Sequence, residues 1–165
     1  MDRKSQRFEA LVQAFAADLY RYAHWLDEDL PIEGLLQETF TRAWRTIDTL
    51  RDEHSARRWL FATLRQLASR HLPLEPQIDP DPPSKGAGGF DQASTAALRR
   101  AFRQLPLAYR DPLLLQILGG FSTADIALLL HLTPSATTSR LARGRRCLRD
   151  LLKVLPAARS LGRSS

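Results

Sequence analysis

The residues best suited to chemistry in this chain are arginines and short hydroxyl side chains near its C-terminus. They are concentrated in the segment from Thr133 to Arg149, which the apolar spacing predicts to be helical. Small hydroxyl groups can approach bases and phosphates closely, and arginine can neutralise phosphate charge or read guanine. The candidate DNA contacts here are Ser135, Ala136, Thr138, Ser139, Arg140, Arg143, Arg145 and Arg146. The alternative is a cationic helix that only packs against its neighbours.

A helix-turn-helix would position these side chains. Ser122 is suited to cap a helix from Thr123 to about Leu130, and Thr133 with Pro134 is suited to open the next one. The apolar residues that could close the motif are Ile126, Ala127, Leu130, Leu132 and Leu141. In such motifs the N-terminal end of the second helix enters the major groove. His131 lies in the turn and must either become left-handed or reshape it.

Catalytic and metal-binding chemistry is not expected. Cys147 is the single cysteine, and His24, His54 and His71 have no partner at a suggestive spacing. We therefore predict no enzyme activity, no metal and no cofactor. No run of 18 apolar residues occurs, and no apolar stretch follows the charged N-terminus, so we expect neither membrane insertion nor a signal peptide and place the protein in the cytoplasm.

Charge and composition divide the chain into three parts. Residues 1–72 carry 11 basic and 11 acidic residues, residues 73–91 carry 1 and 4, and residues 92–165 carry 12 and 3. The net charges are 0, −3 and +9, so a polyanion is expected to meet the C-terminal part. The middle part is rich in proline and glycine and predicts a flexible linker. We expect an all-α protein of two small helical domains, 1–72 and 92–165, with few fixed contacts between them.

The periodicity places three helices in the N-terminal domain. The first carries Phe8 to Leu26, the second runs from about Pro31 to Leu50, and Ser55 can cap the third. On the second helix Leu36, Phe40, Ala43 and Ile47 could face a core, which leaves a mixed polar face.

In the C-terminal domain, Ser94 can cap a helix that ends near Leu105. Asp111 and Pro112 are suited to start the next one, from Leu113 to Leu118. The helix-turn-helix described above follows.

Three segments resemble the sigma factors of bacterial RNA polymerase, in their extracytoplasmic-function (ECF) group. Residues 35–45 resemble the helix that docks on the polymerase clamp, and residues 58–67 resemble the part of the second region that opens and captures the downstream promoter box. Residues 105–145, with Phe121-Ser122-Thr123-Ala124-Asp125-Ile126-Ala127 and Ser139-Arg140-Leu141-Ala142-Arg143-Gly144-Arg145, resemble the fourth region, which binds the upstream box.

The resemblance implies partners and site residues. Core RNA polymerase and promoter DNA would be partners, and an anti-sigma protein often restrains such factors. The implied polymerase contacts are Glu33, Leu36, Gln37, Glu38, Thr41 and Arg42. The implied downstream-box contacts are Arg58, Trp59, Arg65 and Gln66, where Trp59 is either a wedge between bases or a core residue. The upstream-box contacts are those of the C-terminal helix given above.

The chain departs from the family pattern at Gly34, Gln66, His131, Ala136-Thr137 and Pro112. No arginine cluster follows His71 either, which predicts a weaker grip on the downstream box. Two other hypotheses therefore stay open. One is a DNA-binding regulator that uses only the helix-turn-helix, and the other is a sigma-like decoy that binds an anti-sigma factor.

Overall fold

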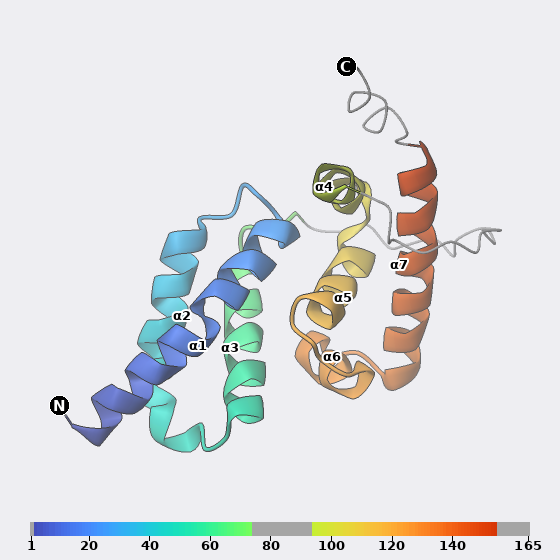
Figure 1. Ribbon diagram of the computed structural model, residues 1–165. Helices are drawn as coiled ribbons and strands as arrows, with labels where there is room; N and C mark the ends of the chain where they lie inside the picture. Colours follow the sequence, from blue (N-terminus) through green and yellow to red (C-terminus); the bar gives the residue numbers. More distant parts are fainter. Residues whose placement is uncertain (1, 74–93, 155–165) are drawn as a thin grey trace.

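The computed structural model describes residues 2–73 and 94–154, and all regular structure in these ranges is helical, as predicted. The elements are α1 (Arg3–Leu26), α2 (Ile32–Thr46), the short 3-10 helix η1 (Ile47–Thr49), α3 (Glu53–Ala68), α4 (Thr95–Gln104), α5 (Leu107–Ile117), α6 (Thr123–Leu130) and α7 (Pro134–Val154). Figure 1 shows two groups side by side. We call α1–α3 the N-terminal lobe and α4–α7 the C-terminal lobe. The expected linker lies outside the described residues, except for Pro73.

Short polar side chains begin most of these helices, as local sequence predicts. Ser94 accepts a hydrogen bond from the Ala97 amide, and Ser122 accepts one from the Asp125 amide. The predicted cap of α3 was wrong by three residues. Asp52 is the cap, and it accepts hydrogen bonds from both the amide and the hydroxyl of Ser55. A carboxylate at this position also interacts favourably with the helix dipole.

The start of α5 was also predicted wrongly. The helix begins at Leu107, directly after Pro106, and Pro112 lies inside it rather than at its start. An interior proline removes one backbone hydrogen bond and costs stability. The helix nevertheless continues, because Tyr109 and the leucines 113 to 115 are fully buried on either side of the proline.

The buried stripe of α2 is rotated by about one residue from the predicted one. Ile32, Leu35, Thr39 and Ala43 are buried, whereas Leu36 and Phe40 are only half-buried. Thr39 could not be recognised as a core residue from its type. It is tolerated there because its hydroxyl donates a hydrogen bond of 2.7 Å to the Leu35 carbonyl.

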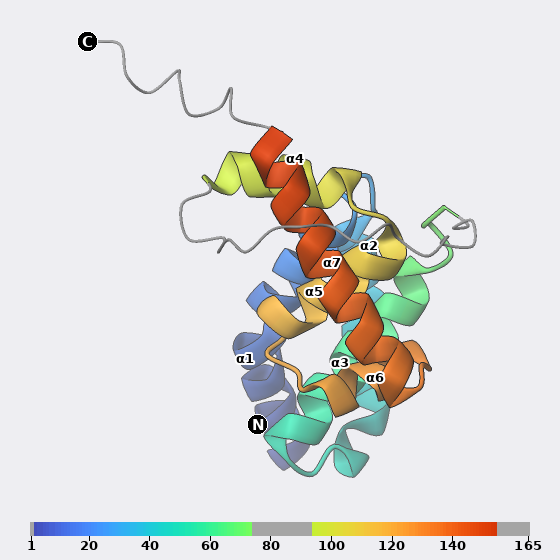
Figure 2. The ribbon, with the colours of Figure 1, turned by 90° about the vertical axis from the view of Figure 1, so that its right-hand side faces the viewer.

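The two lobes pack against each other, contrary to the expectation of few fixed contacts. Helices α1 and α3 contact α5 and α6, and one buried apolar cluster contains residues of both lobes. The rings of Phe61 and Phe121 meet across the junction with centroids 5.2 Å apart, and those of Trp25 and Phe102 are 5.6 Å apart. In the view of Figure 2, α7 lies on the outer side of the C-terminal lobe.

Candidate DNA and polymerase interfaces

The predicted helix-turn-helix is present as α6, a turn at His131–Thr133, and α7. His131 takes the left-handed conformation, with φ 54° and ψ 43°, which is the first of the two alternatives considered from sequence. Its amide bonds back to the carbonyls of Ala127 and Leu128 and so ends α6. Thr133 then caps α7 by accepting a hydrogen bond of 3.1 Å from the Ala136 amide.

The core face of α7 determines which side chains face outward. Thr137, Leu141, Gly144 and Leu148 are buried against the lobe. At Gly144 a Cβ would lie 3.0 Å from the Leu113 side chain and 3.2 Å from that of Tyr109, so the close crossing of α7 and α5 favours a glycine. A helix places residues three and four apart on one face. The face opposite the buried one therefore carries Ser135, Ser139, Arg143 and Arg146.

The other predicted upstream-box residues flank this outer face. Thr138 is exposed, and its hydroxyl donates to the Pro134 carbonyl. Arg145 is held by the side-chain oxygen of Gln116 on α5. Arg140 is half-buried and points to a cavity between the lobes, and Ala136 is half-buried near the turn.

The polar face predicted on α2 is on the surface. Glu33, Gln37, Glu38 and Thr41 are exposed, while Leu36 and Arg42 are half-buried. Glu38 and Arg42 form an ion pair of 3.0 Å one helical turn apart. Gly34, where the family usually has Asp, is exposed with open space at its Cβ position.

The four predicted downstream-box residues lie on two different faces of α3. Trp59 is half-buried against the apolar cluster, and Gln66, two turns later, is exposed. Arg58 and Arg65, also two turns apart, face the C-terminal lobe. Arg65 donates a hydrogen bond of 2.7 Å from Nε to Asp111, and Arg58 lies 3.4 Å from Asp125.

Comparison with known proteins identifies both lobes. Residues 11–73 match the family described as Sigma-70 region 2, and residues 95–148 match the family described as Sigma-70, region 4. The probable RNA polymerase sigma-C factor of Mycobacterium bovis is 30% identical over 153 residues, covering 85% of this chain and 80% of that protein. The ECF RNA polymerase sigma factor SigL of Mycobacterium tuberculosis is 32% identical over 165 residues, covering 91% of each.

The chain belongs to the sigma-70 family, in its ECF group.

This sigma factor also shares its fold with a solved relative. The sigma factor RpoE of Bartonella quintana, determined in complex with the anti-sigma factor NepR, superposes with a TM-score of 0.64 at 24% identity, over 92% of this chain and 97% of that one. Family membership establishes the function as promoter recognition and transcription initiation by RNA polymerase. Among the described residues no helix is long and apolar enough to cross a membrane.

The lobe junction of this sigma factor contains functional candidates that sequence reasoning missed. Asp111 is buried between the lobes and accepts hydrogen bonds from the Tyr22 hydroxyl, at 2.5 Å, and from Arg65. Burial, the charge of Asp111 and the hydrogen bond to it raise the pKa of Tyr22 well above its usual value. The sequence offered one indication that these aspartates are special, because Asp111, Asp125 and Asp150 are the only acidic residues from 92 to 165.

A second missed residue, Arg57, lies at the centre of the junction. Its Nε donates a hydrogen bond of 2.8 Å to the Gly119 carbonyl of the C-terminal lobe, and its other nitrogens bind Asp18 of α1 at 3.2 Å. The guanidinium also lies over the rings of Phe15, Phe61 and Phe121, at 5.7, 5.6 and 6.0 Å from their centroids. Arg57 therefore connects α1, α3 and the loop that follows α5.

Asp125 combines a local and a long-range role. Within α6 it bonds to Ser122 at the helix start, and across the junction it meets His54 at 3.3 Å and Arg58. Partial burial opposes its charged form, but the Ser122 hydrogen bond and the charges of His54 and Arg58 outweigh it and lower the pKa of Asp125.

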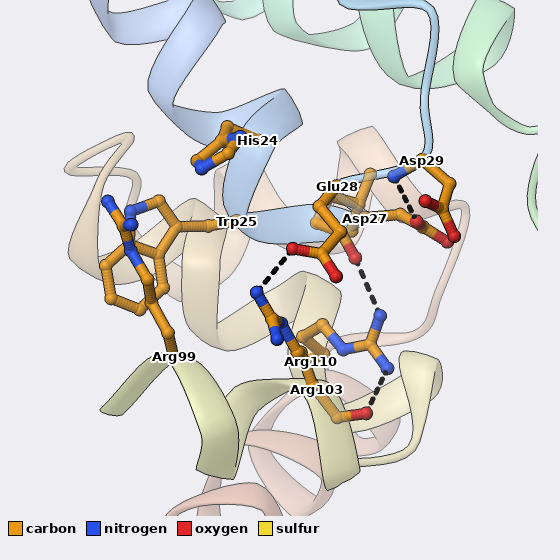
Figure 3. A pocket seen from close by; sticks show the side chains of 9 residues that line it. His24, Trp25, Asp27, Glu28, Asp29, Arg99, Arg103 and Arg110 are labelled. Atoms are coloured by element: carbon orange, nitrogen blue, oxygen red, sulfur yellow. Dashed lines mark hydrogen bonds and ion pairs between the residues drawn. The ribbon is translucent and has the colours of Figure 1, made fainter. Parts of the chain in front are cut away.

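The opposite end of the junction is a mixed-charge pocket of about 210 Å³. Figure 3 shows Glu28 bonded to Arg103 of α4, and Arg110 of α5 directed at the end of α1. Arg110 donates a hydrogen bond of 2.6 Å to the Leu26 carbonyl, and Arg99 lies over the ring of Trp25. The Glu28–Arg103 ion pair and the Arg110–Leu26 hydrogen bond therefore join the two lobes at this pocket.

Proposed function

We propose that this sigma factor uses three separate surfaces, one for polymerase and two for promoter DNA. The observation that carries the proposal is the outer face of α7, where Ser135, Ser139 and Arg143 follow one another at single-turn spacing directly after the turn. Small hydroxyl groups followed by arginine at the N-terminal end of a recognition helix suit entry into the major groove. This face would bind the upstream box.

Core polymerase would bind the exposed face of α2 that contains Glu33, Leu36, Gln37, Glu38, Thr41 and Arg42. Half-exposed Leu36 would supply an apolar anchor, and the Glu38–Arg42 pair would supply charge complementarity at its edge. The opened downstream box would bind α3 through Arg58, Trp59, Arg65 and Gln66.

The remaining expectations follow from this role. Residues 1–72 and 92–165 would act as the two promoter-binding domains, with 73–91 linking them. The protein would work in the cytoplasm, where polymerase meets the chromosome, and would carry no catalysis of its own. An anti-sigma protein is a further proposed partner, since the structural relative is bound to one.

The test is reconstitution with the core polymerase of the same organism. Co-purification measures binding, and runoff transcription from genomic fragments enriched by the holoenzyme measures initiation. Glu38→Lys should weaken core binding by on the order of 1 to 3 kcal/mol. Glu9→Lys makes the same charge change on an exposed position of α1 and should have little effect. Equal core affinity of the two variants would contradict the α2 assignment.

Binding to duplex DNA, to core polymerase and to an anti-sigma protein separates the alternatives. Arg143→Ala should reduce binding to the selected upstream box by roughly 1 to 3 kcal/mol if Arg143 reads a base. A chain that binds duplex DNA but no core polymerase would instead be a helix-turn-helix regulator. A chain that binds an anti-sigma protein but neither polymerase nor DNA would be a decoy.

A further inference from the structure

We propose that Arg7 is a positioning residue for promoter opening, because it fixes residues 47–52, which we call the α2–α3 connection. The proposed polymerase face lies on α2 and the proposed downstream-box residues lie on α3, so this connection helps to set the orientation of one surface relative to the other. The inference rests on the proposed function, because it takes α2 as the polymerase contact and α3 as the DNA contact.

The hydrogen bonds of Arg7 are the first argument. Its Nη2 donates to the Ile47 carbonyl at 3.2 Å and to the Leu50 carbonyl at 3.1 Å, and its Nη1 lies 3.8 Å from the Asp48 carboxylate. The side chain of Asp48 is 74% exposed, so this ion pair contributes little beside the two hydrogen bonds. Carbonyls at the end of a helix lack partners within the helix, and a cation there interacts favourably with the helix dipole. Arg7 therefore caps the C-terminal end of α2 and η1 from a neighbouring helix.

The way in which the connection is anchored is the second argument. The side chains of Ile47 and Leu50 are buried, whereas Thr49, Arg51 and Asp52 are exposed. The connection is therefore attached to the lobe at two buried points, and Arg7 bonds the backbone at both. Apolar burial is not directional, whereas hydrogen bonds are, so the guanidinium fixes the path of the backbone between these points.

The neighbours of Arg7 on α1 are the third argument. The ring of Phe8 meets that of Trp44 edge-on with centroids 5.2 Å apart, and the Lys4 ammonium lies 4.6 Å from the centroid of the Trp44 ring. These contacts hold the start of α1 on the end of α2, so Arg7 itself has a fixed position. The match to Sigma-70 region 2 begins at residue 11 and therefore assigns no role to Arg7.

The length of α3 makes its direction important. At about 1.5 Å per residue, Gln66 lies roughly 20 Å from the start of the helix, so a tilt of about 3° there moves Gln66 by about 1 Å. A displacement of this size in a reacting complex can reduce a rate by up to about a hundredfold. A small change in the connection is therefore expected to affect the downstream-box contacts more than the polymerase contact on α2.

The first experiment measures the connection in the free protein, by amide hydrogen exchange of peptides that cover residues 47–52. In Arg7→Ala we expect exchange about tenfold faster than in the wild type. Arg3→Ala is the control, because it removes the same charge one turn earlier, where Arg3 forms no ion pair among the described residues. Its exchange should equal that of the wild type. Unchanged exchange in Arg7→Ala would overturn the proposal.

The second experiment measures opening by the reconstituted holoenzyme, as the rate at which promoter thymines become reactive to permanganate at saturating holoenzyme. Arg7→Ala should open a selected promoter about tenfold more slowly than the wild type. Its affinities for core polymerase and for the upstream box should stay within about twofold. An opening rate equal to that of Arg3→Ala would overturn the proposal. So would a loss of core affinity as large as the loss in opening, because Arg7 would then support the whole lobe.

Loss of stability is separated from loss of positioning by Asp2→Ala. The Asp2 side chain caps α1 by accepting a hydrogen bond of 2.7 Å from the Ser5 amide. Its removal destabilises the same end of α1 without touching the α2–α3 connection. Asp2→Ala should therefore open the promoter at the wild-type rate. Opening as slow as in Arg7→Ala would show that the stability of α1 is the cause, and would overturn the positioning role.

Arg7→Lys covers the case in which Arg7→Ala does not fold. Lysine keeps the charge but replaces the planar guanidinium by a compact ammonium that is less suited to bridge two carbonyls. Its exchange and its opening rate should lie between those of the wild type and Arg7→Ala, and wild-type values for both would overturn the proposal. A wild-type chain that binds no core polymerase would overturn the proposed function and this inference with it. An active wild type with unaffected Arg7 variants would overturn this inference alone.

Discussion

Replacing Arg57 with alanine should undock the two lobes and lower the free energy of unfolding by about 2 to 4 kcal/mol. The charged hydrogen bond from Nε to the Gly119 carbonyl, 2.8 Å long, contributes roughly 1.5 to 3 kcal/mol. Contacts with the three aromatic rings add roughly 0.5 to 1 kcal/mol in all, because they share one guanidinium. The Asp18 pair adds little to the loss, because Asp18 also lies 3.9 Å from Arg21 and keeps that cation in the variant.

The assay is urea unfolding, which is monitored on the same samples by tryptophan fluorescence and by circular dichroism. All three tryptophans, Trp25, Trp44 and Trp59, belong to the N-terminal lobe, whereas circular dichroism reports helices of both lobes. If docking makes the lobes one cooperative unit, the two midpoints coincide in the wild type. In Arg57→Ala both midpoints should fall, and they should separate.

Arg70→Ala is the matched control, because Arg70 is exposed at the end of α3. Its free energy of unfolding should stay within about 0.5 kcal/mol of the wild type. The reasoning would be refuted if Arg57→Ala were as stable as Arg70→Ala with coincident midpoints, since the junction would then contribute nothing to stability.

Three further predictions concern single positions. His131→Gly should raise the free energy of unfolding by roughly 0.5 to 1 kcal/mol over His131→Ala, because only glycine is unstrained at φ 54°; equal stability of the two in urea melts would contradict this. The Tyr22 hydroxyl ionises with a higher pKa in the folded protein than in the unfolded chain, where its pKa is about 10. Its contribution to the free energy of unfolding is therefore complete below about pH 10 and is lost as the pH rises through the higher folded pKa. Stability should therefore decline above about pH 10, and this part of the decline should be missing in Tyr22→Phe, as urea melts from pH 8 to 11 can establish. Gln66, exposed on α3, carries one methylene more than the family's usual Asn, so Gln66→Asn should increase open complex on a selected promoter. Permanganate reactivity of thymines at equal polymerase occupancy measures the effect, and no increase in the mutant counts against it.

The features that sequence predicted correctly depend on neighbours in the chain. Ser94 and Ser122 cap their helices, and Thr133 with Pro134 opens α7, because each cap bonds an amide three residues away. At His131 the sequence left two alternatives open, and the structure takes the left-handed one. The resemblance to ECF sigma factors was confirmed because its motifs occur in order along both lobes.

The features that sequence missed depend on burial by distant segments. Pro112 has the sequence context of a helix start, but packing around Tyr109 and the three leucines holds it inside α5. In α2, Leu35 and Thr39 are buried in place of the expected Leu36 and Phe40, and the hydrogen bond from the Thr39 hydroxyl to the Leu35 carbonyl makes this burial tolerable.

The docking of the lobes was decided by tertiary structure alone. Tyr22, Arg65 and Asp111 meet from sequence separations of 89 and 46 residues, and no local pattern indicates that they are partners. Sequence indicated which side chains are candidates for DNA binding: residue type and helical spacing indicated those of α7, and the family resemblance implied those of α3. The packing of α5 and α6 on α3 decides which of these side chains are exposed. The carboxylates buried by this packing are stabilised by ion pairs with the arginines that lie next to them.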